Sequence, residues 1–150
     1  MENFITGYLE KNEENTLHRG VIWTRWLTLR LENGRTLPIF DMNAISANLP
    51  VHRSYSVVVM ATYPKGLRYF PTVPRDVKPG VWHGIVLNPA WQTHSIGFRR
   101  ARHTIDDLEA VLIETPCGCL LMDAADLGGP VQAGGFVQWD ASDFDLCAIC

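Results

Sequence analysis

The sequence predicts a mostly β protein composed of two similar halves. Short stretches in which every second residue is apolar recur along the 150-residue chain, and a period of two is typical of strands with one buried face. A segment of the first half also aligns with a segment of the second half. Between the halves, residues 71–80 contain three prolines and a glycine, which interrupt helix and strand and therefore indicate a linker.

The aligned segments predict an internal repeat. Residues 28–45 lie over residues 110–127 without a gap, at a constant offset of 82 residues. Each copy carries a glutamate at the end of an apolar strand, a turn glycine, and an aspartate that is suited to cap a short helix. These residues are Glu32, Gly34 and Asp41 in the first copy and Glu114, Gly118 and Asp123 in the second.

Both halves are expected to contain the same order of elements, with five strands and a short helix between the third and fourth strands. The predicted first-half elements are strands near 4–10, 20–31, 35–40, 55–62 and 67–70, and a helix near 42–48. The predicted second-half strands lie near 81–87, 108–114, 119–122, 136–139 and 144–149, and Asp123 opens the second helical turn.

This order of elements resembles the OB-fold, a small five-stranded Greek-key barrel whose second and third strands present a binding face. The resemblance is one of topology and covers each half of the chain. It implies two tandem OB-like barrels, residues 1–70 and 81–150, joined by the proline-rich linker 71–80. It also implies binding of an oligonucleotide, an oligosaccharide or a protein. A β-sandwich or a single fused barrel is the alternative architecture.

Charge and composition restrict the partners. The formal net charge of −3 argues against a protein that coats nucleic acid or anionic membrane through bulk charge. The charge is uneven, because residues 1–76 carry nine Lys or Arg against seven Asp or Glu, and residues 77–150 carry four against nine. The N-terminus lacks the pattern of a signal peptide, and no run approaches the roughly 18 apolar residues of a membrane span. These features predict a cytoplasmic protein with no membrane partner.

The long strand of the first half provides the main candidate site. Alternation places Trp23, Arg25 and three leucines on one face and Trp26, Thr28 and Arg30 on the other. An indole with neighbouring hydroxyls and a guanidinium is suited to stack bases and contact phosphate, so this face is a candidate site for single-stranded nucleic acid. The residues that extend the candidate site are Tyr63, Lys65, Arg68 and Tyr69. An ordinary solvated strand with one exposed tryptophan is the alternative interpretation.

The corresponding strand of the second half favours a protein partner. Leu108, Ala110 and Leu112 alternate with the apolar Val111 and Ile113, and a strand that is apolar on both faces is covered on both faces. The cover is provided by the first barrel, by a helix or by a partner. The second candidate function is therefore that of an adaptor, assembly factor or inhibitor that binds through Leu108, Ala110 and Leu112.

Catalytic and metal-binding signals are weak. Cys117, Cys119, Cys147 and Cys150 form a candidate zinc site, although the first pair is separated by one residue where structural zinc sites usually have two to four. Buried reduced thiols are the alternative. The chain has no G-x-S-x-G, P-loop, dinucleotide or H-E-x-x-H motif. We therefore expect no catalytic residues and no cofactor, and a small metal-dependent hydrolase that uses its acidic residues is the third candidate function.

Overall fold

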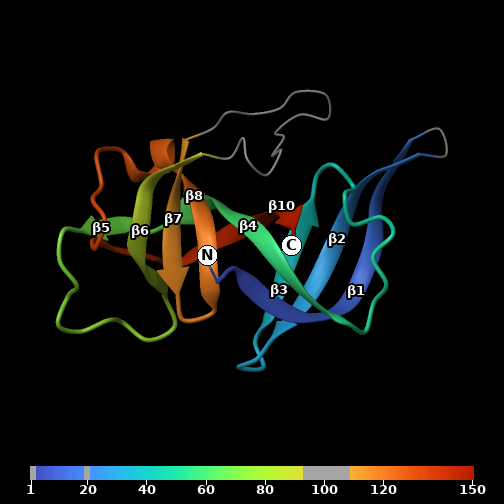
Figure 1. Ribbon diagram of the computed structural model, residues 1–150, viewed down its shortest axis with the longest axis horizontal. Coiled ribbons are helices and arrows are strands. Elements are labelled where there is room, and N and C mark those ends of the chain that lie inside the picture. The colour runs from blue at the N-terminus through green and yellow to red at the C-terminus, as the bar shows by residue number, and fades with distance from the viewer. Residues whose placement is uncertain (1–2, 19–20, 93–108) are drawn as a thin grey trace.

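The computed structural model describes residues 3–18, 21–92 and 109–150, and these residues form a single ten-stranded sheet (Figure 1). The strands are β1 Ile5–His18, β2 Val21–Leu31, β3 Thr36–Asp41, β4 Ser54–Lys65, β5 Arg68–Phe70, β6 Trp82–Gln92, β7 Glu109–Thr115, β8 Gly118–Asp123, β9 Phe136–Trp139 and β10 Ala141–Ile149. Each predicted strand overlaps one of them. Within the described ranges, no helix is long and apolar enough to cross a membrane.

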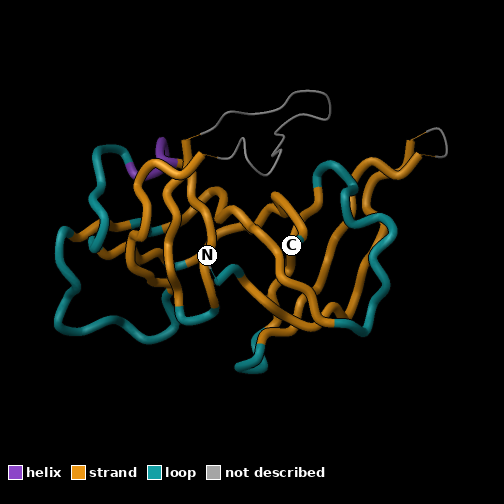
Figure 2. The backbone as a smooth tube through the Cα atoms, viewed as in Figure 1, coloured by secondary structure: helices purple, strands orange, loops and turns teal. Residues whose placement is uncertain are grey.

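Helix is nearly absent from the residues that the structure describes. The one helical element in the described part of the chain is a single 3-10 turn, η2, Ala124–Leu127 (Figure 2). Asp123 caps it as predicted, because its side chain accepts a hydrogen bond from the Ala125 N–H at 3.0 Å. The helix predicted at 42–48 is replaced by turns, although Asp41 accepts hydrogen bonds from the backbone N–H groups of Ile45 and Ser46.

Five strands close into a barrel. Their order is β1-β2-β3-β10-β4, and β4 pairs again with β1. The contact between β3 and β10 is parallel, whereas the other neighbours are antiparallel. A closed five-stranded barrel with extra strands is consistent with the OB-like barrel predicted for the first half.

The strand that closes this barrel comes from the end of the chain. Residues 144–149 were predicted to belong to a second barrel, but β10 lies between β3 and β4. The predicted fifth strand of the first half, β5, has only three residues and pairs with β9 instead. β10 is nine residues long, and its Phe144 and Leu146 supply buried side chains to the barrel core beside β4. A strand as short as β5 cannot supply this burial.

The other five strands extend the sheet from β4 in the order β8-β7-β6-β9-β5. In Figure 1, β4 and β10 run across the middle of the molecule between β1–β3 on one side and β6–β8 on the other. The mostly β class and one closed barrel are thus confirmed, whereas a second tandem barrel is not. Residues 71–80 contain neither helix nor strand and connect β5 to β6.

Two clusters of buried side chains hold the sheet together. The larger one combines the inner face of the barrel with one face of β6–β9. The smaller one lies on the opposite face of β7 and β8, where Ala110, Leu112 and Leu121 pack with Val58 and Met60 of β4. The prediction that β7 is covered on both faces is therefore confirmed, and the cover includes β4 of the same chain.

The gapless alignment of the two halves does not match the strand register in the second hairpin. An offset of 82 places Cys119 over Leu37, which faces the larger cluster, but Cys119 faces the smaller cluster and Leu120 faces the larger one. The reason is the length of the turn between paired residues, because five residues lie between the partners Arg30 and Thr36 and two lie between the partners Thr115 and Gly118, an odd difference. A change of one residue in register turns each side chain of a strand to the other face.

Candidate binding site on the barrel

The outer face of β2 and β3 carries an aromatic pair. Trp26 lies opposite Phe40 in the register of these strands, with ring centroids 5.0 Å apart. The Trp26 side chain is 39% exposed, while Arg25 and Leu27 on either side of it are buried. The predicted alternation of faces along β2 is therefore confirmed for the side chains that the structure describes. The side chain of Trp23 lies outside the described residues.

A partly buried polar contact supports this orientation. Arg25 points inward, and its Nε donates to Asn12 Oδ1 at 2.6 Å while its guanidinium also donates to the Asn12 carbonyl. The Asn12 amide in turn donates to the carbonyls of Ser46 and Leu49, and these hydrogen bonds join β1 to the turns after β3. Because neighbouring side chains of a strand point to opposite faces, the inward Arg25 requires Trp26 to point outward.

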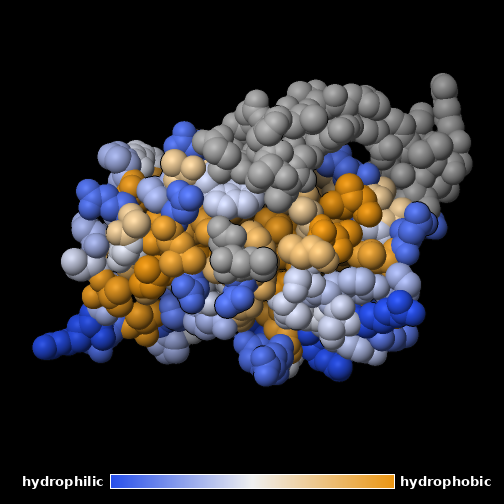
Figure 3. Space-filling model, viewed as in Figure 1, coloured by the Kyte–Doolittle hydropathy of each residue, from blue (hydrophilic) through white to orange (hydrophobic). Residues whose placement is uncertain are grey.

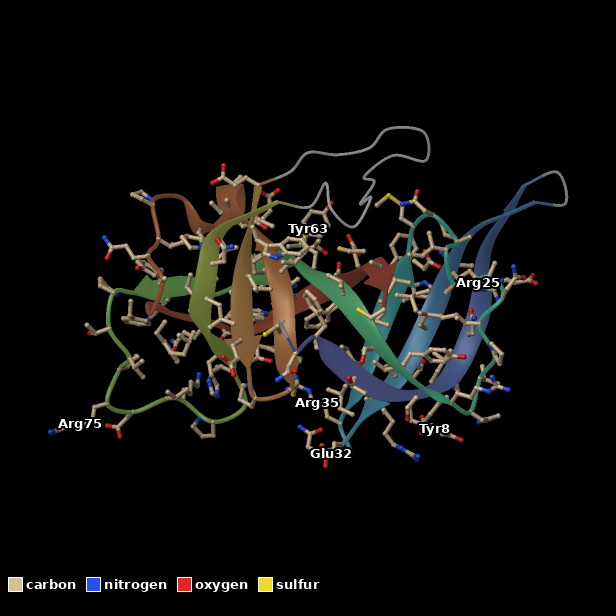
Figure 4. The ribbon with its side chains drawn as sticks, viewed as in Figure 1. Tyr8, Arg25, Glu32, Arg35, Tyr63 and Arg75 are labelled. Atoms are coloured by element: carbon tan, nitrogen blue, oxygen red, sulfur yellow. The ribbon has the colours of Figure 1, made fainter. Side chains whose placement is uncertain are left out.

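A cavity of about 350 Å³ opens beside the aromatic pair and combines aromatic and acidic side chains. Its lining residues are Asn15, Trp26, Phe40, Met42, Tyr63, Asp143 and Asp145. Tyr63 is 80% exposed and has a φ of 51°, a conformation that side-chain-bearing residues seldom adopt, so β4 deviates locally where Tyr63 projects (Figure 4). The cavity thus offers three aromatic rings and two carboxylates to a ligand.

The two carboxylates differ in their surroundings. Burial, and secondarily the negative charge of Asp143, raise the pKa of Asp145 to about 6. Asp143 itself is exposed. A positive charge placed in the cavity would stabilise the ionised form of Asp145, because an opposite charge favours ionisation. The site is therefore suited to a cation and unsuited to an anion.

A second cavity of about 300 Å³ continues from the first and shares Trp26 and Asp143 with it. Its other lining residues are Arg35, Thr36, Leu37, Pro38, Trp82, Asp140, Ala141, Ser142 and Phe144. The Arg35 guanidinium lies over the Trp82 ring, 4.2 Å from its centroid. Among the described residues that line either cavity, the one cationic side chain is thus already held by an aromatic face.

The residues predicted to bind nucleic acid do not form one site. Thr28 lies on the Trp26 face, as does Arg30, but Arg30 pairs with Glu10 at 3.0 Å and lies over the Tyr8 ring. Lys65 ends β4 opposite Ala141, near the second cavity.

Arg68 and Tyr69 lie far from this face in the sheet. They belong to β5, which ends the strand order opposite to β1 and β2. The Tyr69 hydroxyl accepts a hydrogen bond from the Gln132 N–H at 3.0 Å, so this residue fastens the 128–135 loop. The structure therefore separates Arg68 and Tyr69 from Trp26.

The residues predicted to bind a protein partner are covered by the chain itself. Ala110 is 0% exposed and Leu112 is 2% exposed, because both pack in the smaller cluster against β4 and β10. Leu108 lies outside the described residues. A partner cannot reach Ala110 or Leu112 unless these strands separate, so the structure does not present them as a docking surface.

The four cysteines do not form a metal site in the structure. In the described part of the chain, no group of three or more His, Cys, Asp or Glu side chains is arranged to hold a metal ion. Cys147 is buried, and burial raises the pKa of its thiol, whereas Cys150 is exposed. Asp140, Asp143 and Asp145 likewise form no metal-binding group there.

Comparison with known proteins provides no assignment. No protein-family model matches the chain, and no curated protein matches its sequence. The function is therefore inferred from the residues of the site.

Sequence reasoning named Trp26 and Tyr63, which line the same cavity, but it did not place Phe40, Asp143 and Asp145 beside them. Phe40 alternates with the inward Leu37 and Ile39, so its outward position could be predicted from the same period of two. Asp143 and Asp145 could not be placed beside Trp26, because β2 and β10 lie far apart in the chain and their side chains line one cavity only in the folded protein.

Proposed function

We propose that this protein is a non-catalytic binding module that recognises a positively charged segment of another protein on the outer face of its barrel. The observation that carries the proposal is the cavity in which Trp26, Phe40 and Tyr63 lie together with Asp143 and Asp145. The proposal keeps the prediction that the Trp26 face of β2 is a binding surface. It differs in the ligand, which is a positively charged protein segment and not a negatively charged nucleic acid.

The chemistry of the cavity favours a cation. Aromatic faces attract ammonium and guanidinium groups by about 0.5–1 kcal/mol when exposed and about 2 kcal/mol or more when desolvated. The carboxylates of Asp143 and Asp145 add charge-assisted hydrogen bonds to the same group. A lysine or arginine side chain can use both contributions, because its aliphatic stem packs on rings while its charged end reaches carboxylates.

Only one of the two comparable faces is open to a ligand. The outer face of β2 and β3 exposes Trp26, whereas the corresponding face of β7 and β8 is buried in the smaller cluster. If the halves derive from one repeated unit, the second copy now serves the packing of the molecule. The first copy alone retains an accessible face.

Single-stranded nucleic acid is the second candidate ligand. The exposed Trp26 indole on the second strand of an OB-like barrel favours it, because base stacking on such rings tolerates any sequence. The adjacent carboxylates oppose it, since phosphate contacts require local positive charge. Arg30, the predicted phosphate contact, already forms an ion pair with Glu10.

Fluorescence anisotropy separates the two candidates. The probes are a labelled nonapeptide of alternating lysine and valine and a labelled single-stranded oligothymidine of similar length. The peptide is expected to bind, and Trp26→Ala and Asp143→Asn are each expected to weaken it by about fivefold. Asp76→Asn is the matched control, because it removes the same charge from the exposed 71–80 loop; it is expected to change the affinity by less than about twofold.

The result that contradicts the proposal is equally specific. Oligothymidine binding that is lost with Trp26→Ala, strengthened by Asp143→Asn and weakened steeply by salt would identify nucleic acid as the ligand. If Asp143→Asn and Asp76→Asn changed the affinity for the peptide equally, the peptide would be attracted by the overall charge of the protein, and the cavity would not be its binding site.

A further inference from the structure

The cavity beside Trp26 and Phe40 is crossed by four neighbouring strands, whose order is β2-β3-β10-β4. Trp26 lies on β2 and Phe40 on β3, the two carboxylates lie on β10, and Tyr63 lies on β4. Phe40 is opposite both Trp26 and Asp145 in the register of these strands. Along the strand order, the carboxylates are therefore flanked by aromatic rings on both sides.

A β-bulge brings Tyr63 to this cavity. Between the pairs Thr62–Asp143 and Lys65–Ala141, β4 contains one residue more than β10. Tyr63 lies within this bulge and has a φ of 51°. Strict alternation after Thr62 would turn Tyr63 away from the face that carries Asp143, but Tyr63 and Asp143 line the same cavity. A bulge can redirect a side chain in this way, so the third ring depends on an irregularity of β4.

The apolar part of the cavity is suited to methyl groups. Phe40 and Met42 flank the last residue of β3, and both line the cavity together with Trp26 and Tyr63. Figure 3 shows hydrophobic surface over the upper ends of β3 and β10. An unmodified lysine ammonium is strongly hydrated and has three donors that need acceptors, which rings and a thioether supply poorly. Methylation replaces these donors by apolar surface and keeps the positive charge that attracts aromatic faces.

The arrangement of the rings and carboxylates restricts the shape of the cation. The planes of Trp26 and Phe40 are inclined by 44°, so they do not form a parallel slot for a flat guanidinium. A methylated ammonium is tetrahedral and contacts inclined rings on several sides. The carboxylates beside the rings can accept a hydrogen bond from an N–H group, which dimethyllysine retains and trimethyllysine lacks.

We infer that the cationic side chain bound in this cavity is dimethyllysine, with its methyl groups against Trp26, Phe40 and Tyr63 and its remaining N–H donated to a carboxylate of β10. The inference rests on the proposed function for the charge of the ligand and adds the chemical identity of the charged group. The partner is thus a protein with a methylated lysine in an accessible segment. Several rings around a methylated ammonium are an established use of the cation–π interaction.

Peptides that differ only in methylation test the inference. The lysine–valine nonapeptide is compared with versions in which every lysine carries one, two or three methyl groups, and with a version in which arginine replaces lysine. All five peptides carry the same charge, and uniform modification makes the register of binding irrelevant. The dimethyl peptide is expected to bind about fivefold more tightly than the unmodified peptide, and more tightly than the other three.

The outcomes separate the inference from the proposed function. If any of the other four peptides binds as tightly as the dimethyl peptide, the inference is overturned while the proposed function stands. Failure of all five peptides to bind would contradict the proposed function as well.

Substitutions of Tyr63 test the contact with the methyl groups. Tyr63→Ala should reduce the preference for the dimethyl over the unmodified peptide to less than about twofold, whereas Tyr63→Phe keeps the ring and should keep the preference. The side chain is 80% exposed, so both variants should fold, and circular dichroism checks this. An undiminished preference in Tyr63→Ala would show that this ring is not part of the site and would overturn the inference.

Substitutions of the carboxylates test the hydrogen bond. Asp143→Asn or Asp145→Asn should bring the affinities for the dimethyl and trimethyl peptides to within about twofold of each other, because the charged acceptor for the N–H is lost. Asp76→Asn is the matched control and should retain the difference. An unchanged difference in both cavity variants would overturn the assignment of the N–H to β10.

Discussion

Asp145 connects the stability of the barrel with its proposed function, and the two depend on pH with opposite signs. Its pKa is raised to about 6 by burial and by Asp143, so the folded protein favours the protonated side chain. The ionised side chain, in contrast, is the form that attracts a cation. Lowering the pH through 6 should therefore stabilise the folded protein and weaken its affinity for the ligand.

The first prediction concerns stability. Because the folded pKa of Asp145 lies above the ordinary value of 3.8, its contribution to the free energy of unfolding is full below pH 4 and is lost as the pH rises through 6. Asp145→Asn should remove this contribution to the pH dependence. Urea unfolding of both proteins between pH 4 and pH 7 is the measurement, and the unchanged protein should gain stability relative to the variant toward pH 4. A constant difference over this range would show that Asp145 titrates normally.

The second prediction concerns affinity. Peptide binding should weaken as the pH falls from 7 to 5, by roughly two- to fivefold, because a partly exposed ion pair contributes about 0.4–1 kcal/mol. Asp145→Asn should bind the lysine–valine peptide more weakly at pH 7 and lose most of this pH dependence. Anisotropy titrations at both pH values check it, with Asp76→Asn as the control that retains the dependence. Identical pH profiles for Asp145→Asn and the unchanged protein would exclude Asp145 from the site.

At the scale of elements, a close approach between β6 and β7 requires a glycine. A Cβ on Gly84 would lie 2.5 Å from the Glu114 carbonyl oxygen and 2.5 Å from Ile113 Cγ2. Since the carbonyl belongs to a paired strand, the clash cannot be relieved by a side-chain rotation. Gly84→Ala should therefore destabilise the protein by about 1–3 kcal/mol.

Gly129→Ala is the matched control for this third prediction. A Cβ at Gly129 has no neighbour within 4 Å, so the change should stay within about 0.5 kcal/mol. Chemical denaturation of both variants measures the difference. Comparable stability of the two variants would mean that β6 and β7 are not held as closely as the structure shows.

The positions of the strands could be predicted from the sequence, but their partners could not. Alternation is a local signal, so β2 and the outward position of Trp26 follow from neighbouring residues alone. The length of a turn is also a local feature. However, the register of the β7–β8 hairpin, which brings Leu120 rather than Cys119 to the larger cluster, depends on the exact residue at which each strand begins. A sequence pattern locates that residue only to within a few positions. The acidic half of the candidate site was missed because β10 meets β3 only in the folded chain.

At the scale of the whole molecule, β10 makes the two halves depend on each other. It was predicted to complete residues 81–150, but it supplies Phe144 and Leu146 to the barrel of β1–β4. β4 in turn pairs with β8 through Met60 and Leu121. Each half thus places a strand beside strands of the other half, and residues 71–80 connect them without taking part in the sheet.

The fourth prediction follows from this exchange. A fragment of residues 1–80 lacks β10, so β3 and β4 lose a neighbour and the buried Val59 and Ala61 lose the contacts that β10 provides. The fragment alone should give a poorly dispersed amide spectrum and no cooperative unfolding. Mixing it with residues 81–150 should restore the spectrum of the intact protein, because the cut falls in a segment without strands. The intact chain cleaved at an inserted protease site within residues 71–80 is the control, and it should remain folded. A cooperatively folded 1–80 fragment would show that the barrel closes without β10 and that the predicted boundary at residues 71–80 separates independent domains.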